Sequence, residues 1–225
     1  MILAELSYQD KLSETVSVNA KLNQYISHAN AHFYIFPAGS LIPVGNDGNL
    51  LQPHNGEGCQ TVNIPGLGCL TEFSDGVRGN PGSTDKATSV DVSFTIDKWR
   101  NHQVRAAIGW KKETYKATEQ KNFGPGVLDT ATIGGVNPIT VDGTLTDVTS
   151  TDYVYSESTS RDVKHLLLQD IWQIEENWTL TSGLRYDHYS DFGSTFNPRI
   201  SLVWQSTEAL TVKLLYGTAY RAASI

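Results

Sequence analysis

The sequence predicts an all-β protein built as an antiparallel meander of about eight strands. Strand-length segments alternate between apolar and polar residues, short and long connections alternate between them, and aromatic residues stand at segment ends. Successive side chains of a strand point to opposite faces, so such alternation gives a sheet one apolar and one polar face. The strands are expected at residues 1–9, 15–36, 85–98, 103–122, 161–175, 177–189, 196–205 and 209–221.

The first four expected strands form two hairpins. Residues 1–9 and 15–36 are joined by a short polar link at 10–14. The next two strands alternate clearly. Their apolar positions are Val90, Val92, Phe94 and Ile96, then Val104, Ala106, Ile108 and Trp110. The residues between them are polar, charged or small, as a half-buried or lipid-facing strand requires.

The C-terminal segments repeat this pattern. Trp178, Leu180, Ser182, Leu184 and Tyr186 alternate with Thr179, Thr181, Gly183, Arg185 and Asp187. Leu210, Val212, Leu214, Tyr216 and Tyr220 share a face opposite Thr211, Lys213, Gly217, Ala219 and Arg221. An apolar face with aromatic ends opposite a hydrophilic face is typical of a membrane barrel strand. A soluble antiparallel sandwich alternates equally well, because one face of each sheet packs on the core.

Loop lengths favour the barrel over the sandwich. Short links are expected at 10–14, 99–102, 175–177 and 206–208, and longer ones at 37–84, 124–160 and, more modestly, 190–195. Every second hairpin therefore opens at the same end of the sheet. Outer-membrane barrels sort their connections in this way, with short turns on one side and long loops on the other.

Composition excludes several classes. No run of about 18 apolar residues exists, which excludes a transmembrane helix but not a barrel. The net charge of −7 argues against a nucleic-acid binder. Met1 is followed by no basic region, long apolar run or cleavage site, so no signal peptide is expected. This fits either a soluble protein or a fragment of a longer chain.

The only two cysteines, Cys59 and Cys69, lie in the first long loop. Two cysteines that close a small loop rich in glycine and proline predict a disulfide, formed in an oxidising compartment. A metal site would need more ligands than nearby His54, and two free thiols are the remaining alternative.

Three motifs follow one another along the chain. They are Gly183-Leu184-Arg185-Tyr186-Asp187, then Asn197-Pro198-Arg199-Ile200-Ser201, then Leu215-Tyr216-Gly217-Thr218-Ala219-Tyr220-Arg221-Ala222-Ala223-Ser224. In this order they resemble the mid-barrel of TonB-dependent outer-membrane receptors. Gln169-Asp170-Ile171-Trp172 is similar to the preceding strand of that family. The resemblance covers residues 161–225 and is architectural before them. Ala223 stands where the family usually has a proline.

The resemblance implies an active transporter for a scarce nutrient such as an iron–siderophore or cobalamin. It also implies a plug domain, outer-membrane lipid around the barrel, and energy from a periplasm-spanning TonB complex. Such barrels have about 22 strands. Residues 1–225 are therefore expected to be an incomplete section of a large outer-membrane β-barrel, without a plug, whose full-length parent binds the plug and the TonB complex. The alternative is a soluble β-sandwich or adhesin-like ligand-binding module.

Charged residues on the polar positions are the candidate site. They are expected to face the barrel lumen and are Arg105, Lys111, Arg185, Asp187, Arg199, Lys213 and Arg221. In a complete receptor they would bind plug carboxylates or guide an anionic chelate. The alternative is that they solvate a polar interior and pair with neighbouring acids. No residue pattern predicts a catalytic site, a cofactor or a metal, so no enzyme is expected.

Overall fold

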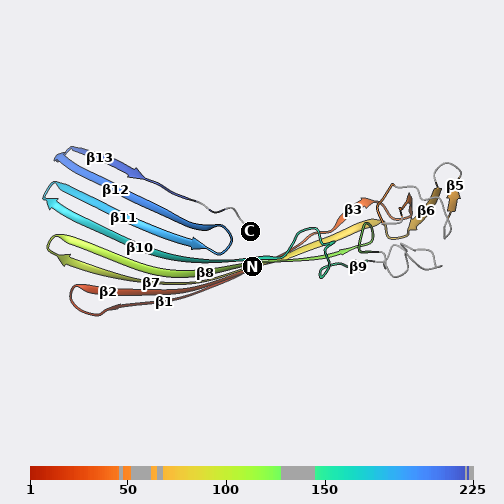
Figure 1. Ribbon diagram of the computed structural model, residues 1–225, viewed down its shortest axis with the longest axis horizontal. Coiled ribbons are helices and arrows are strands. Elements are labelled where there is room, and N and C mark those ends of the chain that lie inside the picture. Colours follow the sequence, from red (N-terminus) through yellow and green to blue (C-terminus); the bar gives the residue numbers. More distant parts are fainter. Residues whose placement is uncertain (46–47, 52–61, 65–67, 128–144, 221, 223–225) are drawn as a thin grey trace. The chain divides into compact units, whose positions relative to one another are not determined.

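The computed structural model describes residues 1–225 apart from 46–47, 52–61, 65–67, 128–144, 221 and 223–225 (Figure 1). All regular elements of the described residues are strands. They are β1 Ile2–Lys11, β2 Val16–Asn30, β3 Phe33–Phe36, β4 Ser40–Pro43, β5 Val62–Ile64, β6 Gly68–Phe73, β7 Val77–Trp99, β8 His102–Lys121, β9 Thr146–Asp147, β10 Thr159–Glu175, β11 Trp178–Tyr189, β12 Gly193–Thr207 and β13 Leu210–Gly217. Among the described residues, no helix has the length and apolar character to cross a membrane.

Eight strands follow one another across a single antiparallel sheet. Their order is β1-β2-β7-β8-β10-β11-β12-β13, with β3 added to β7 and β9 added to β8. Every neighbour in this order is also the next long strand in the sequence, so the sheet is a meander. The sheet is open, with β1 and β13 at its ends. The predicted fold class is confirmed, and the eight predicted strands are not divided between two packed sheets as a sandwich requires.

The chain divides into two compact units. The first unit comprises residues 1–27, 85–115 and 159–225. Its hairpins close through short turns, as predicted. Between β7 and β8 the turn residues Arg100 and Asn101 have φ angles of 50° and 64°. Positive φ at both central residues is the geometry of the two-residue hairpin turns whose twist matches the strands.

The connection between β11 and β12 corrects the prediction of a longer link at 190–195. Strand β12 already begins at Gly193, which pairs with Tyr189, and Ser194 pairs with His188. Gly193 takes a φ of 94°, which a residue without a side chain adopts at little cost. The Tyr189 and Phe192 rings stack across the turn, with their centres 4.2 Å apart. The connection is therefore only residues 190–192.

The second unit comprises residues 28–84 and 116–158 and has a core of its own. It contains a small sheet in the order β4-β6-β5. The buried core residues are Ile42, Val44, Phe73 and Val77, and Phe36, Leu50 and Phe123 pack against them. Residues 37–84 and 124–160, predicted as loops, therefore contribute β4, β5, β6, β9 and the start of β7.

Asn122 connects two segments inside this second unit. It is fully buried, its Nδ2 donates to the Gly76 carbonyl oxygen (2.9 Å), and its Oδ1 accepts from the Arg78 amide (2.9 Å). Its own amide donates to the Arg78 carbonyl oxygen (3.2 Å). A side chain thus completes the backbone hydrogen bonding at the start of β7, where burial makes a missing partner costly.

Replacing Asn122 with alanine is expected to destabilise the second unit by about 1–3 kcal/mol, because the Arg78 amide and Gly76 carbonyl lose their buried partners. Hydrogen exchange at the Arg78 amide would measure the effect as faster exchange. Asn23→Ala is the control, since Asn23 lies in the first unit and its side chain lies 3.5 Å from Ser89 Oγ. Unchanged exchange at Arg78 in Asn122→Ala would contradict the prediction.

The C-terminal residues of β8 form hydrogen bonds with residues 146–158 of the same unit. The Ala117 amide donates to Ser158 Oγ (3.1 Å), and the Glu119 amide donates to Thr149 Oγ1 (3.0 Å). In return, the Val148 amide donates to the Glu119 carbonyl oxygen (2.9 Å). Pairing with β10 ends at Tyr115, so these contacts satisfy a stretch of strand that would otherwise present an unpaired edge.

Candidate functional site

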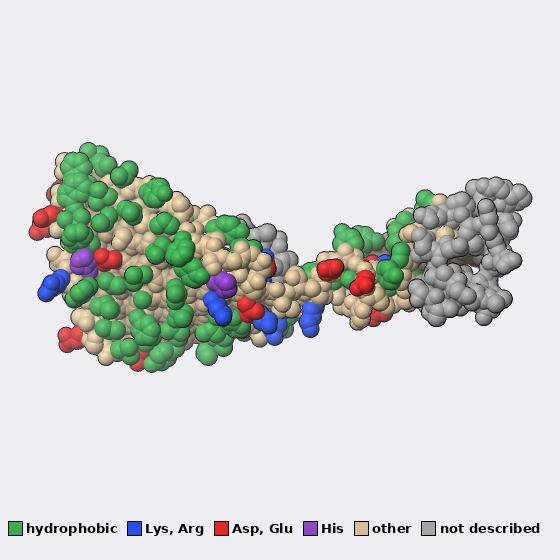
Figure 2. Space-filling model, viewed as in Figure 1, with side chains coloured by type: hydrophobic (Ala, Val, Ile, Leu, Met, Phe, Trp, Pro, Cys, Tyr) green, Lys and Arg blue, Asp and Glu red, His purple; other side chains and the backbone are tan. Residues whose placement is uncertain are grey.

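The sheet of the first unit has one face covered with apolar side chains, here called the apolar face. Strand register places Ile108, Leu166, Tyr186 and Phe196 directly opposite one another across β8, β10, β11 and β12. Most of these side chains are exposed, and Leu166 and Phe196 are 53% and 64% exposed. Figure 2 shows hydrophobic side chains spread widely over these strands. An exposed apolar area this extensive marks an interaction surface.

Aromatic residues bound the apolar face at both ends of the strands. Near the short turns, Trp178 stacks on Trp204 at 5.1 Å, and Trp172 stacks on His102 at 5.3 Å. Toward the other end, the rings of Tyr186 and Phe196 lie 4.8 Å apart. Rings with an apolar body and a polar edge suit the boundary between hydrocarbon and water. The predicted aromatic strand ends therefore exist as two bands.

The opposite face, here called the polar face, carries the described candidate site residues together. The cross-strand pairs are Arg105–Gln169, Lys111–Val163, Arg185–Leu167, Asp187–His165, Arg199–Gly183 and Lys213–Val203. All of these positions share one parity through β8, β10, β11, β12 and β13, so they lie on one face. The seventh candidate, Arg221, lies outside the described residues.

Arg185 and Asp187 form one ion pair rather than two separate charges. Arg185 Nε lies 3.0 and 2.9 Å from the two Asp187 carboxylate oxygens, and Nη2 lies 2.7 Å from Oδ1. Asp187 is only 4% exposed. A two-pronged guanidinium–carboxylate contact of this kind is strong and directional. Arg185 therefore neutralises a buried acid and is not a free cation.

Lys111 begins a chain of charges that the sequence analysis did not find. Its Nζ lies 2.5 Å from Glu113, and Glu113 lies 4.0 Å from the buried Arg161. Arg161 donates from Nε and Nη2 to Asp191, both at 2.7 Å, and its guanidinium lies 5.2 Å from the centre of the Phe192 ring. Arg161 thereby attaches the turn between β11 and β12 to β10.

The hydrogen bond from Arg161 lowers the pKa of Asp191 below its ordinary value of 3.8. A lowered pKa in the folded state stabilises the turn above the ordinary carboxyl pKa, and this contribution is lost as the pH falls through the lowered value. Exchange at the Ser190 amide, which donates to the Asp162 carbonyl oxygen (2.9 Å), would report turn opening. We expect Asp191→Asn to accelerate this exchange above the ordinary carboxyl pKa, and the difference from the unmodified chain to vanish in more acidic solution.

Glu208→Gln is the matched control, because it removes a carboxylate from the turn between β12 and β13. It should leave Ser190 exchange unchanged at every pH. A difference between Asp191→Asn and the unmodified chain that persists at strongly acidic pH would show that Asp191 acts without its charge.

His165 and Asp91 form a further pair on the polar face. His165 Nε2 lies 3.2 Å from Asp91 Oδ1. The strand partner of His165 on β8 is Gly109. A side chain built at Gly109 would collide with the His165 ring and would reach within 2.5 Å of Asp91 Oδ1. The glycine therefore leaves the space that the His165 ring occupies.

Three of the candidate cations are accessible to a ligand. Arg105, Arg199 and Lys213 are exposed and, within the described ranges, form no ion pair. Arg105 lines a hollow of about 440 Å³ on the polar face. Its other polar lining residues include Gln9, Ser17, Asn19, Lys21 and Gln169. Amide, hydroxyl and cationic groups around one space suit a hydrogen-bonding anion.

Two further predictions concern residues that the structure describes only in part. Cys59, one partner of the predicted disulfide, lies outside the described residues, and so does the side chain of Cys69. The disulfide stays a prediction. Among the described residues, no group of three histidine, cysteine, aspartate or glutamate side chains is placed to hold a metal ion.

Comparison with known proteins gives a family match over almost the whole chain. The family model described as TonB dependent receptor-like, beta-barrel, matches residues 5–225. The receptor family that matches is not a family of enzymes.

Individual relatives match shorter parts. Two proteins named iron-regulated outer membrane virulence protein, from the classical Ogawa and El Tor Inaba strains of Vibrio cholerae serotype O1, are each 38% identical over 58 residues. This alignment covers 26% of this chain and 9% of each relative. The crystal structure of the siderophore receptor PirA from Pseudomonas aeruginosa aligns with 99% of this chain and 40% of that chain, at 14% identity and a TM-score of 0.32.

Proposed function

Because the chain belongs to the TonB-dependent receptor-like β-barrel family, we propose that it forms a section of the wall of an outer-membrane receptor for nutrient uptake. The observation that carries this proposal is the open meander with one apolar and one charged face. A barrel wall needs both faces, because its outer side contacts hydrocarbon and its inner side lines a polar lumen.

In this proposal the apolar face contacts outer-membrane lipid. Transfer of apolar surface out of water stabilises by about 25 cal/mol per Å². The exposed side chains of β8, β10, β11 and β12 gain this stabilisation only if another apolar phase covers them. The names of the Vibrio cholerae relatives place those proteins in the outer membrane, which supports the same location for the receptor to which this section belongs.

The polar face is proposed to line the lumen. The pairs Arg185–Asp187 and Lys111–Glu113 balance their own charges there. Arg105, Arg199 and Lys213, which form no ion pair with any described residue, would attract anionic ligands or carboxylates of a plug domain, since charges beside low-dielectric walls steer ions effectively. From its place in the sequence pattern, Arg221 is proposed to join them.

The nutrient is proposed to be an iron chelate of the siderophore type. The iron-regulated character in the names of the relatives supports this class over cobalamin. A plug domain and the energy-transducing TonB complex are proposed as partners of the receptor to which this section belongs.

Labelling of two neighbouring residues on opposite faces tests the wall assignment. In a Cys59→Ser/Cys69→Ser background, Ile108→Cys and Ala107→Cys would each carry an environment-sensitive fluorophore in phosphatidylcholine vesicles. We expect brominated acyl chains to quench the label at position 108 and to leave the label at 107 in a polar environment. Equal responses at both positions, or a chain that dissolves without detergent and ignores the vesicles, would instead support a soluble binding module.

A further inference from the structure

A row of basic residues crosses the apolar face just beyond its second aromatic band, and is here called the basic row: Lys112, Lys164 and His188. Lys164 pairs across the strands with Trp110 on one side and with His188 on the other. Lys112 pairs with Asp162. All three basic side chains are exposed. Their positions have the parity of Ile108 and Leu166, so they share the apolar face with them.

The two ammonium groups of this row are not neutralised. Asp162 is the acid beside them, and its Oδ1 accepts from Trp110 Nε1 at 2.9 Å. His188 Nδ1 lies 2.9 Å from Ser194 Oγ. In the part of the chain that the structure describes, neither Lys112 nor Lys164 forms an ion pair. The row therefore carries positive charge in excess of its one carboxylate.

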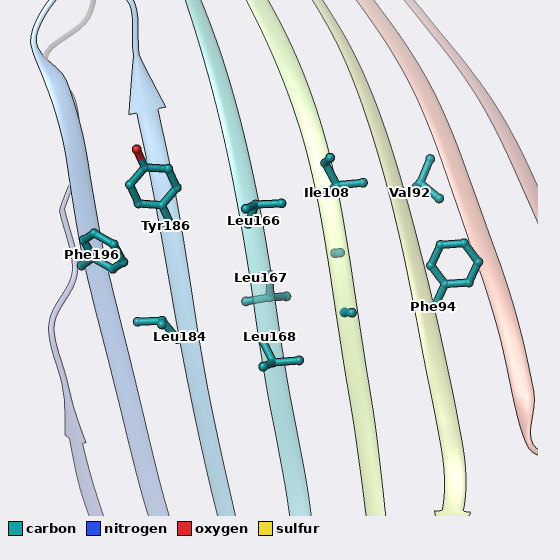
Figure 3. A pocket seen from close by; sticks show the side chains of 11 residues that line it. Val92, Phe94, Ile108, Leu166, Leu167, Leu168, Leu184, Tyr186 and Phe196 are labelled. Carbon is teal, nitrogen blue, oxygen red and sulfur yellow. The ribbon is translucent and has the colours of Figure 1, made fainter.

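An apolar hollow begins next to the basic row. It has a volume of about 540 Å³, and its lining includes Ile108, Leu166, Leu168, Leu184, Tyr186 and Phe196 (Figure 3). The labelled side chains come from neighbouring strands. Ile108 and Leu166 lie two residues along their strands from Trp110 and Lys164, a distance of about 7 Å at the usual rise of a strand. Charge and hydrocarbon surface are thus adjacent.

We propose that this surface binds one phosphate-bearing anionic lipid, with its phosphate on Lys112 and Lys164 and an acyl chain in the hollow. Clustered basic residues beside a membrane attract anionic headgroups. Ammonium groups beside an apolar surface favour a ligand with an anionic head and an apolar tail. The head contacts the ammonium groups, and the tail contacts the apolar surface next to them. Trp110 lies between the two parts, at the level suited to an amphipathic ring. The proposal rests on the proposed function only in that the apolar face contacts lipid.

Trp110 also supplies the readout. The other tryptophans, Trp99, Trp172, Trp178 and Trp204, lie near the short turns, so the fluorescence lost in Trp110→Phe isolates the signal of Trp110. Quenching of that signal would be measured in vesicles of equal parts phosphatidylcholine and phosphatidylglycerol, once with only the phosphatidylcholine brominated and once with only the phosphatidylglycerol brominated. We expect a preference for phosphatidylglycerol that falls about fivefold for each ammonium removed, in Lys112→Gln and in Lys112→Gln/Lys164→Gln.

Lys11→Gln is the matched control for Lys112→Gln, because it removes the same charge from the polar face, where Lys11 pairs with Ser17. It should keep the preference, and its loss there would show that only net charge matters. A preference retained in Lys112→Gln/Lys164→Gln, or abolished by excess soluble glycerol phosphate, would overturn the lipid site. Quenching by both lipids without preference would overturn this inference alone, whereas no quenching by either would overturn the proposed function as well.

Discussion

Replacing Phe73 with alanine is expected to destabilise the second unit by about 3–5 kcal/mol, the range for truncating a large buried aromatic side chain. Phe73 has no exposed surface and packs with Ile42, Val44 and Val77. Removal of the ring loses transfer free energy and leaves a cavity that so small a core cannot refill. Its backbone oxygen accepts from the amides of Gly39 (2.8 Å) and Gly76 (2.9 Å). Hydrogen exchange at these two amides measures the effect.

Phe33→Ala is the control for this change, because Phe33 lies in the same unit but is 58% exposed. It should alter the exchange rates at Gly39 and Gly76 little, since surface substitutions usually change stability by less than about 0.5 kcal/mol. Equal acceleration by the two substitutions would show that the cluster around Phe73 is not what stabilises this unit.

Replacing Leu168 with arginine should weaken insertion of the sheet into a bilayer by about 2–4 kcal/mol, the range for a cation on the lipid face near the midplane. Leu168 is 56% exposed on the apolar face and pairs with Ala106 and Leu184 in the middle of its strand. The guanidinium would have to leave water or distort the lipid around it. Equilibrium unfolding from phosphatidylcholine vesicles, followed by tryptophan fluorescence, measures the change.

Thr181→Arg places the same side chain on the polar face, where Thr181 pairs with Ile171 and Ser201. It should cost less than about 1 kcal/mol, because a lumen position keeps the charge in water. A cost equal to that of Leu168→Arg would mean that the two faces do not meet different environments.

The long strands were predictable because the alternation extends over many residues. The segments Val90 to Ile96 and Trp178 to Asp187 each repeat the apolar–polar alternation several times. Whether a residue has an odd or an even position in such a segment then assigns its side chain to one of the two faces. Strands β4, β5 and β6 are three to six residues long and lie among glycines and prolines, so no period is visible. The start of β7 contains Pro81, which argues against a strand, although its carbonyl oxygen accepts from the Ala31 amide at 2.9 Å.

The candidate site was predictable as a face but not as a set of contacts. Parity alone places Arg105, Arg199 and Lys213 together. The pair Arg185–Asp187 also follows from parity, since residues two apart on a strand share a face, and it agrees with the alternative that the charges on this face pair with neighbouring acids. The contact of Arg161 with Asp191 joins residues 30 apart. It depends on the strand register and on the tight turn at 190–192, neither of which a single sequence reveals.

The separate core of the second unit has an evolutionary consequence. All members of the Phe73 cluster come from residues 28–84 and 116–158, so this core includes no residue of the hairpins β10–β11 and β12–β13. Substitutions and changes of length in these two segments can therefore accumulate while the hairpins that follow keep their alternation, because connecting segments tolerate change better than paired strands do. A lineage that meets a new ligand would be expected to diverge fastest in these two segments.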